Sequence, residues 1–378
     1  MKKKLLAMLF LSLCAISRAQ IKNITSKYDL PSAVSETSGL LFYKGKLITH
    51  NDSGDAANLY EIDTISGNIT RTIQVTNASN VDWEAITQDE DYFYIGDFGN
   101  NNGTRDDLKI YRILKSDYDN TTSVSSEVIA FSYEDQQDFT TNPYNHDFDA
   151  EAFTVYNNQL IVFTKNWASS TVSAYTIPAE IGNHTAKKIG NYNTQGLITD
   201  AAYNPEDNSL LLCGYNKQGN PLLVYLPNIT TDKLFDGTIE RTDITSSVGI
   251  ASQIEGLTHI EGNTYFLSRE RVNRTVNGIP IQLNQRLFRF DNGSFETLSV
   301  APYSLESIHI YPNPSKDLIL ISGIDVAQLF ITDSHGKNIL KKKNSSNQIR
   351  IGELTTGVYF LKIIAHDKRQ FSKKIIKN

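Results

Sequence analysis

The chain has 378 residues, of which 40% are hydrophobic and 10% aromatic, a composition that excludes a disordered or fibrous protein. The formal net charge is −6, but residues 20–300 alone carry −16, because residues 1–19 and 301–378 are both basic. An acidic body argues against nucleic acid as a partner, since phosphate binding needs the opposite sign, and is compatible with cations.

The first 19 residues have the pattern of an export signal. Three lysines precede an apolar run from Leu5 to Ile16, and Ser17 and Ala19 are the small residues that a cleavage point before Gln20 requires. We therefore predict a signal peptide over residues 1–19, with a retained anchor as the alternative. No later apolar run is long enough to cross a membrane, so we expect no integral membrane segment after signal cleavage.

A short phrase recurs five times in the body of the chain. An acidic residue or Ser is followed by small and apolar residues, then by a polar turn and a second apolar run. The aligned copies begin at Ser38, Glu84, Glu151, Asp200 and Glu255. Self-similarity at this period, with several short strands in each copy, is typical of a β-propeller. We predict an all-β fold with a five-bladed propeller over residues 20–300, and six blades are the alternative.

Each repeat also predicts its own internal arrangement. Runs of four to eight residues fit the four antiparallel strands of one blade. Runs 160–163 and 210–212 are apolar without alternation, so we expect these strands to be covered on both faces. The polar insertion Glu134 to Asn145 predicts a surface loop. The segment Ile24 to Leu30 is expected to pair with the last repeat and so to close the ring.

The antiparallel geometry brings the recurring acids to one mouth of a central channel. Their mutual repulsion would be relieved by a cation, by protonation, or by pairing with a basic side chain. Oxygen ligands suit Ca²⁺ or Mg²⁺, and Ca²⁺ is the candidate cofactor. The candidate metal ligands are Glu84, Glu151, Asp200 and Glu255. In the alternative interpretation each acid only holds one blade to its neighbour by hydrogen bonds, and no ion is bound.

The ends of the second runs are expected to surround the same mouth. They supply candidate ligand-binding residues, namely His50, Asn51, Asp52, Asp97, Lys165, Asn216 and Arg269. Acids two residues before the aligned positions face the same way in a strand of period two, and could extend the metal site or bond the loops between blades. These are Glu36, Asp82 and Asp149.

The chain changes character after residue 300. We predict a short linker over residues 301–306 and a small Ig-like β-sandwich over residues 307–378, where alternating strands are separated by turn signals. This tail resembles the type A C-terminal sorting domain of the type IX secretion system of Bacteroidota. The resemblance rests on Tyr311, Pro312, Asn313 and Pro314, and on Gly357 and Tyr359. It implies export through the periplasm and across the outer membrane, with that secretion machinery as a partner and a secreted or cell-surface location.

The body carries a second resemblance. The stretches 82–86, 94–100 and 149–153 are similar to a group of uncharacterised secreted bacterial propellers near the esterase-like phytase and SdiA-regulated families. This resemblance implies the fold and the position of the mouth rather than an activity, because its best-matched members have no assigned reaction.

Two functions from different classes remain open. The first is a secreted or surface-exposed module that binds an unknown small molecule or surface ligand, favoured by the absence of a recognisable nucleophile and base. The second is a Ca²⁺-dependent hydrolase of a phosphate ester, ester or lactone, in which Glu151 or Glu255 is the candidate catalytic base. A structural role in surface adhesion or gliding is a third alternative.

Overall fold

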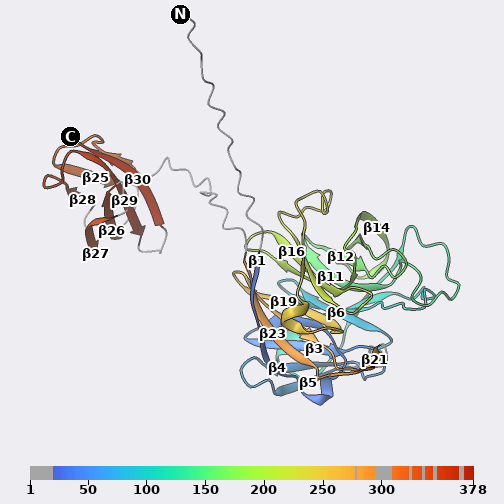
Figure 1. Cartoon of the computed structure of the whole chain (residues 1–378). Helices are drawn as coiled ribbons and strands as arrows, with labels where there is room; N and C mark the ends of the chain where they lie inside the picture. The colour runs from blue at the N-terminus through green and yellow to red at the C-terminus, as the bar shows by residue number, and fades with distance from the viewer. Residues whose placement is uncertain are drawn as a thin grey trace, which may run out of the picture. The chain divides into compact units, whose positions relative to one another are not determined.

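The computed structural model describes residues 20–276, 279–293, 309–322, 326–333, 337–343, 347–365 and 370–378. The predicted signal peptide, residues 1–19, and the predicted linker, residues 301–306, lie outside these residues. The chain divides into two compact units, Met1–Glu296 and Thr297–Asn378 (Figure 1). Strands dominate both, and the helices of the described residues are the short α1 (Lys115–Asp119), α2 (Thr245–Val248) and η1 (Ser32–Val34), so the predicted all-β class is confirmed.

Within its described residues, the first unit contains five groups of four strands, each paired in antiparallel order. The first three groups are β2 (Thr37–Tyr43), β3 (Lys46–Asn51), β4 (Asn58–Asp63) and β5 (Ile69–Val75); β6 (Trp83–Gln88), β7 (Tyr92–Asp97), β8 (Lys109–Leu114) and β10 (Glu127–Tyr133); and β11 (Ala150–Tyr156), β12 (Gln159–Thr164), β13 (Val172–Pro178) and β14 (Gly182–Tyr192). The last two are β15 (Leu197–Asn204), β16 (Ser209–Tyr215), β17 (Pro221–Leu226) and β18 (Glu240–Asp243); and β19 (Ile254–Glu261), β20 (Thr264–Arg269), β23 (Arg286–Gly293) and β1 (Gln20–Asp29).

Outer strands link some of these groups. The start of β14 pairs in parallel with β10 and joins the second and third groups into one eight-stranded sheet. The two-residue strand β9 (Ser123–Val124) extends the first group beyond β5. A hairpin of β21 (Val272–Val276) and β22 (Ile279–Leu283) is inserted between β20 and β23.

The first strand of the chain completes the last group. Strand β1 pairs antiparallel with β23, from Gln20 opposite Gly293 to Asp29 opposite Arg286, and the two ribbons lie side by side in Figure 1. The predicted pairing of the segment 24–30 with the last repeat is therefore confirmed. A free sheet edge would present unpaired N–H and C=O groups, and this pairing covers the edge of β23 that faces away from β20.

The core lies between neighbouring groups. The inner strands β2, β6, β11, β15 and β19 contact one another in that order, and β19 contacts β2 again. In β12, Leu160 and Val162 belong to the cluster shared with the second group, whereas Ile161 and Phe163 belong to the cluster shared with the fourth. Alternate side chains of a strand point to opposite faces, so this strand needs apolar residues at every position. The predicted two-sided burial of residues 160–163 is confirmed.

Each of the five inner strands carries a β-bulge near its start. The pairing register of each inner strand with the second strand of its group slips by one residue, so that one inner-strand residue has no partner. The unpaired residues are Gly39, Glu84, Glu151, Thr199 and Glu255. The sequence alignment placed Ser38 and Asp200 beside the three glutamates, and both assignments are wrong by one residue. A slip of one residue turns a side chain to the other face of a strand.

The second unit consists of two antiparallel sheets that share one hydrophobic core. One sheet contains β24 (His309–Tyr311), β25 (Leu318–Ser322) and β28 (Gln348–Arg350), and the other contains β27 (Asn338–Lys343), β26 (Val326–Asp333), β29 (Gly357–Ala365) and β30 (Gln370–Lys377). Ile319 and Ile349 from the first sheet pack with Leu329, Leu361 and Ile375 from the second. No helix in the described part of the chain is long and apolar enough to span a bilayer.

Candidate functional site

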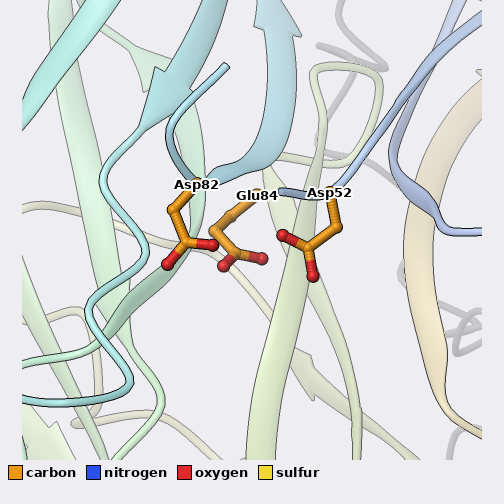
Figure 2. Close-up of side chains that lie close together, drawn as sticks. All are labelled: Asp52, Asp82 and Glu84. Carbon is orange, nitrogen blue, oxygen red and sulfur yellow. The ribbon is translucent and has the colours of Figure 1, made fainter. Parts of the chain in front are cut away.

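Three carboxylates meet where the first two inner strands begin. Asp82 and Glu84 stand at the start of β6, and Asp52 directly follows β3. Their nearest oxygens all lie within 4.8 Å of one another, and Figure 2 shows the three side chains directed toward a common space. We call Asp52, Asp82 and Glu84 the carboxylate cluster. The sequence had named Asp52 and Glu84 as candidates and Asp82 as a possible extension of the site.

The backbone of the neighbouring loop makes room for this cluster. A Cβ on Gly99 would lie 2.2 Å from Oε1 of Glu84 and 2.5 Å from Oδ2 of Asp82, both far inside van der Waals contact. The N–H of Gly99 also donates to the backbone oxygen of Asp82 at 3.2 Å. Only glycine therefore fits at this point without displacing the two carboxylates.

Burial makes the carboxylate cluster electrostatically unfavourable. Desolvation, reinforced by the charges of Asp52 and Asp149, raises the pKa of Asp82 to about 8. The pKa of Glu84 is held well above its usual range by burial first and by the carboxylates of Glu151 and Asp52 second. The pKa of Asp52 is also raised by burial. All three groups consequently favour a proton or another positive charge.

The basic side chains nearest the cluster are already paired elsewhere. Arg105 forms an ion pair with Asp97 at 3.2 Å, and Lys165 forms one with Glu151 at 3.0 Å. The carboxylate of Glu84 forms no hydrogen bond or ion pair with any described residue, although only 4% of Glu84 is exposed. The cluster thus has no free basic side chain beside it among the described residues to neutralise its carboxylates when they ionise.

The buried pair of Glu151 and Lys165 lies beside this cluster. Burial raises the pKa of Glu151, and the Lys165 ammonium opposes that rise. The pKa of Lys165 is held above its usual range by the carboxylates of Glu151, Glu255 and Asp149, against the effect of burial. Its Nζ also lies 4.9 Å from the ring centroid of Trp167. Lys165 therefore stays charged and compensates one of the carboxylates.

Glu255 and Glu270 are two further acids that interact with these groups. We call the carboxylate cluster, the pair of Glu151 and Lys165, and these two glutamates together the acidic end. Burial raises the pKa of Glu255 to about 7, and the Lys165 ammonium opposes this rise. The Oε2 atom of Glu255 is buried and has no hydrogen-bond partner. Burial, reinforced by the charge of Glu255, raises the pKa of Glu270 to about 9. A buried carboxyl oxygen without a partner is costly, and its position suits contact with a ligand.

Asp200 does not take part in this group in the way the sequence predicts. It follows the bulge of β15 instead of occupying it, and its Oδ2 accepts the N–H of Leu257 at 2.6 Å. Its Oδ1 accepts the N–H of Ala201 at 2.8 Å. Burial raises the pKa of Asp200, and these backbone hydrogen bonds oppose the rise. Its carboxylate is directed at the backbone of β19, which is the hydrogen-bonding role that the alternative interpretation described.

Two predicted mouth residues at the end of β3 have local structural contacts. His50 is fully buried and packs edge-to-face against Trp83 with ring centroids 5.5 Å apart. Burial lowers its pKa to about 4, so the ring is neutral at ordinary pH. Asn51 donates to the backbone oxygen of Ala33 at 2.9 Å and to Asp55 at 2.6 Å.

Three further predicted mouth residues hold loops. The buried Asp97 accepts the N–H of Asp82 at 3.1 Å and so positions the start of β6. Arg269 donates to the backbone oxygens of Asn284 and Val248, each at 2.9 Å. The Asn216 side-chain oxygen accepts two backbone N–H groups of its own turn.

A cavity of about 680 Å³ borders the acidic end. We call it the aromatic pocket; its lining includes Tyr144, Trp167, Tyr215, Asn216, Gln253 and Arg274. Trp167 donates its indole N–H to Asp149 at 2.7 Å, which ties the pocket to the acidic groups. Sequence reasoning named only Asn216 among these residues. Trp167 stands two residues after Lys165, a proximity that could have drawn attention to it.

The second unit holds its own predicted motif against the last strand. Asn313 donates to the backbone oxygen of Lys374 at 2.8 Å and accepts the N–H of Ile376 at 2.8 Å. Tyr359 donates to the backbone oxygen of Thr355 at 2.9 Å. Gly357 begins β29, Tyr311 ends β24, and Pro312 and Pro314 lie in the connection from β24 to β25. The motif therefore forms part of the structural frame of this unit.

The donor atoms of the carboxylate cluster and the distances between them are those that a hard divalent cation requires. Ca²⁺ binds carboxylate oxygens at about 2.3–2.6 Å, so two oxygens on one ion are at most about 5 Å apart. The oxygens of the cluster satisfy this limit. Glu84 supplies a buried carboxylate without a partner, and Asp52 and Asp82 supply two more.

Residues 309–378 match the family model of the secretion system C-terminal sorting domain. The second unit is thus a sorting domain of the type IX secretion system, and the protein is secreted or displayed at the cell surface. The match agrees with the predicted sorting domain, including the motif residues Tyr311 to Pro314. No curated protein matches the chain.

Several solved structures are similar to the chain at low identity. PorZ of Porphyromonas gingivalis, an essential surface component of the type IX secretion system, is 13% identical with a TM-score of 0.34; the match covers 96% of this chain and 47% of PorZ. The extracellular domain of a putative hybrid two-component system of B. thetaiotaomicron is 14% identical with a TM-score of 0.33, over 95% of this chain and 59% of that one. An α-L-arabinofuranosidase of Podospora anserina is 8% identical with a TM-score of 0.42, over 72% and 96%. The chain thus spans about half the length of PorZ.

Proposed function

We propose that the protein is an exported five-bladed β-propeller that binds a ligand at its acidic mouth. Five groups of four strands, and inner strands that contact one another in a closed cycle, support the blade count. The two sheets around one core support an Ig-like sandwich for the sorting domain. Relationship to the esterase-like phytase and SdiA-regulated propellers is part of this proposal, and its support is the sequence resemblance alone.

The mouth is proposed to bind Ca²⁺ through Asp52, Asp82 and Glu84. The observation that carries this proposal is the unpartnered, buried carboxylate of Glu84 within 4.8 Å of two further carboxylates. One buried and two half-buried acids that repel one another are unfavourable, and a divalent ion would offset that cost. Glu151 lies close enough to affect Glu84 electrostatically, and Glu255 interacts in the same way with Asp52, but Glu151 is already paired with Lys165.

Calcium titration of the full chain tests the proposed ion. Ca²⁺ should raise the melting temperature of the EDTA-treated protein and give a saturable heat signal in calorimetry. At one hundred times Kd, the stabilisation should be about 2.7 kcal/mol. Asp82→Asn and Glu84→Gln should each abolish the shift, because each removes a negatively charged ligand.

Glu90→Gln is the matched control. Glu90 is exposed and lies at the opposite end of the inner strands, so this variant should keep the full calcium shift. A wild-type protein with neither a thermal shift nor a heat signal would rule out the calcium site. If both Asp82→Asn and Glu84→Gln kept the full calcium shift, the calcium ion would have to be bound by other residues.

A Ca²⁺-dependent hydrolase is the second candidate function. The buried Oε2 of Glu255, which has no partner, favours it because such an oxygen could accept a proton from a substrate or a water. A bound divalent cation would polarise the substrate. Glu255 is the stronger candidate base, because the carboxylate of Glu151 already forms an ion pair with Lys165. Hydrolysis assays with a panel of phosphate esters, carboxylic esters and lactones, each run with Ca²⁺ and with EDTA, test this function. If no substrate were hydrolysed, the hydrolase would be rejected in favour of the ligand-binding module.

A further inference from the structure

The aromatic pocket has a rigid aromatic wall. Tyr144 is 59% exposed, and its ring meets that of Trp167 edge-to-face with centroids 4.9 Å apart. The Tyr144 backbone N–H donates to Asn101 at 3.0 Å, which fastens the inserted loop to its neighbour. Trp167 is fixed by its hydrogen bond to Asp149. The pocket therefore offers a preorganised aromatic surface to solvent, and little ordering of these side chains would be needed on binding.

The rest of the lining is polar and rich in amides. The Asn216 side-chain oxygen is used by its turn, which leaves its NH₂ group available as a donor. The Gln253 side-chain oxygen accepts from Arg274 at 3.1 Å, which fixes the orientation of its amide. Lys217 and Gln218, next in the chain, also line the pocket. These groups supply several directed donors around one aromatic wall.

Such a lining distinguishes between classes of small ligand. A purely apolar ligand would leave the amide and cationic groups without partners, which is unfavourable. An organic cation is disfavoured because the charged residues lining this pocket are Lys217 and Arg274. A sugar ring satisfies both parts, since its C–H face packs on an aromatic ring and its hydroxyls accept and donate around the edge.

We propose that the aromatic pocket binds a saccharide, with a sugar ring against Tyr144 and its hydroxyls hydrogen-bonded by Asn216 and Gln253. This inference rests on the proposed ligand-binding function and names the ligand class. The pocket adjoins the acidic end through Trp167 and Tyr215, but none of the three carboxylates of the cluster lines it. Saccharide binding and calcium binding can therefore be tested separately.

The experiment uses the full chain with two sets of probes. Neutral gluco-, xylo- and manno-oligosaccharides form one set, and uronate oligosaccharides the other, each titrated by calorimetry and by affinity electrophoresis. At least one set should bind saturably. Tyr144→Ala should weaken that binding by about tenfold or more, equivalent to about 1.4 kcal/mol. Preference for the uronate set would identify Lys217 and Arg274 as part of the site.

Phe139→Ala is the matched control. Phe139 is an exposed aromatic residue of the same inserted loop that does not line the pocket, so this variant should bind saccharide normally. Gln218→Ala, at an exposed position, provides a second pocket variant and should weaken binding without unfolding the protein.

The calcium shift separates failure of this inference from failure of the proposed ion. A protein that shows the calcium shift but binds neither probe set would overturn the saccharide site alone. Unchanged binding in both Tyr144→Ala and Gln218→Ala would also overturn it. Saccharide binding that is sensitive to Tyr144 in a protein without a calcium shift would support the pocket and reject the ion.

Discussion

The two ends of the five inner strands differ sharply in chemistry. At their first residues, carboxylates such as Glu84 and Glu255 are buried without full compensation. At their last residues lies a cavity of about 460 Å³ whose lining includes Leu40, Phe42 and Leu257. Of the two acids that line this cavity, Glu90 is exposed to solvent, and Asp89 is satisfied within its own turn and by the hydroxyl of Tyr94 at 2.6 Å.

This contrast separates the requirements of folding from those of binding. The same five strands pack together at both ends. Because they do so at the cavity end without a cluster of buried carboxylates, the packing of the strands does not require the carboxylates found at the acidic end. Apolar burial stabilises the cavity end by about 25 cal/mol per Å² removed from water, whereas uncompensated acids lower stability at the other. Groups that oppose folding persist most readily where they contact something outside the chain, and this makes the acidic end the better candidate site.

The largest expected effect removes the buried positive charge from the acidic end. Lys165→Met should lower the free energy of unfolding by about 3 to 5 kcal/mol at pH 8, because it leaves Glu151 without its counter-ion. Urea denaturation measures the loss. The double variant with Glu151→Gln should recover most of it, and a double variant as unstable as the single one would show that the ion pair is not the cause.

A truncation at the cavity end should act through packing alone. Leu40 is 1% exposed, so Leu40→Ala should cost about 3 kcal/mol through lost burial and a new void. Its calcium shift, measured at a temperature where the variant is folded, should equal that of the wild type. A lost shift would mean that the two ends are coupled and would weaken the contrast between them.

Asp200 tests the structural use of an acid within the same strands. Asp200→Ala should destabilise the protein by about 2 kcal/mol, because the buried N–H groups of Ala201 and Leu257 lose their acceptor. Calcium affinity should stay within about twofold of the wild type, since the carboxylate is directed at backbone. If Asp200→Ala abolished calcium binding without a loss of stability, Asp200 would belong to the metal site after all.

A gradual change in stability, rather than the loss of one contact, is expected when the pH is varied. The pKa of Glu270 is raised from 4.5 to about 9, so the folded state keeps a proton that the unfolded state has released between these values. Stability should therefore fall as pH rises through this window, by at most about 1.4 kcal/mol per pH unit for this group. In EDTA, Glu270→Gln should match the wild type near pH 4 and exceed its stability at pH 8. Parallel curves for the two proteins would exclude this contribution.

The sequence predicted strands well because their signals are local. Apolar runs such as 160–163 and 210–212, bounded by turn residues, correspond to β12 and β16, and the pairing of β1 with the last group was also anticipated. The strand signal is strong at these positions because both faces are covered by neighbouring groups.

The composition of the site was harder to predict because it depends on register. The acids looked equivalent in sequence, but bulges select Glu84, Glu151 and Glu255 and exclude Asp200, and a bulge leaves no clear mark in the sequence. The pairing of Lys165 with Glu151 was one of the options considered. Tyr144 was not foreseen as a pocket residue, because its position depends on how an inserted loop folds back onto residues 101 and 102.

The pairing of β1 with β23 has a consequence for how the body is assembled. Residues near 20 and residues near 293 must meet before the last sheet has its fourth strand. Strand β1, near the start of the chain, therefore cannot pair until β23 has been synthesised. Contacts this distant along a chain are entropically costly to form early, and the ring should seal in a late step. A rearranged chain in which the β1 segment is moved behind β23 on a short connector would turn this remote contact into a hairpin. Such a chain should fold faster and still reach the same final structure.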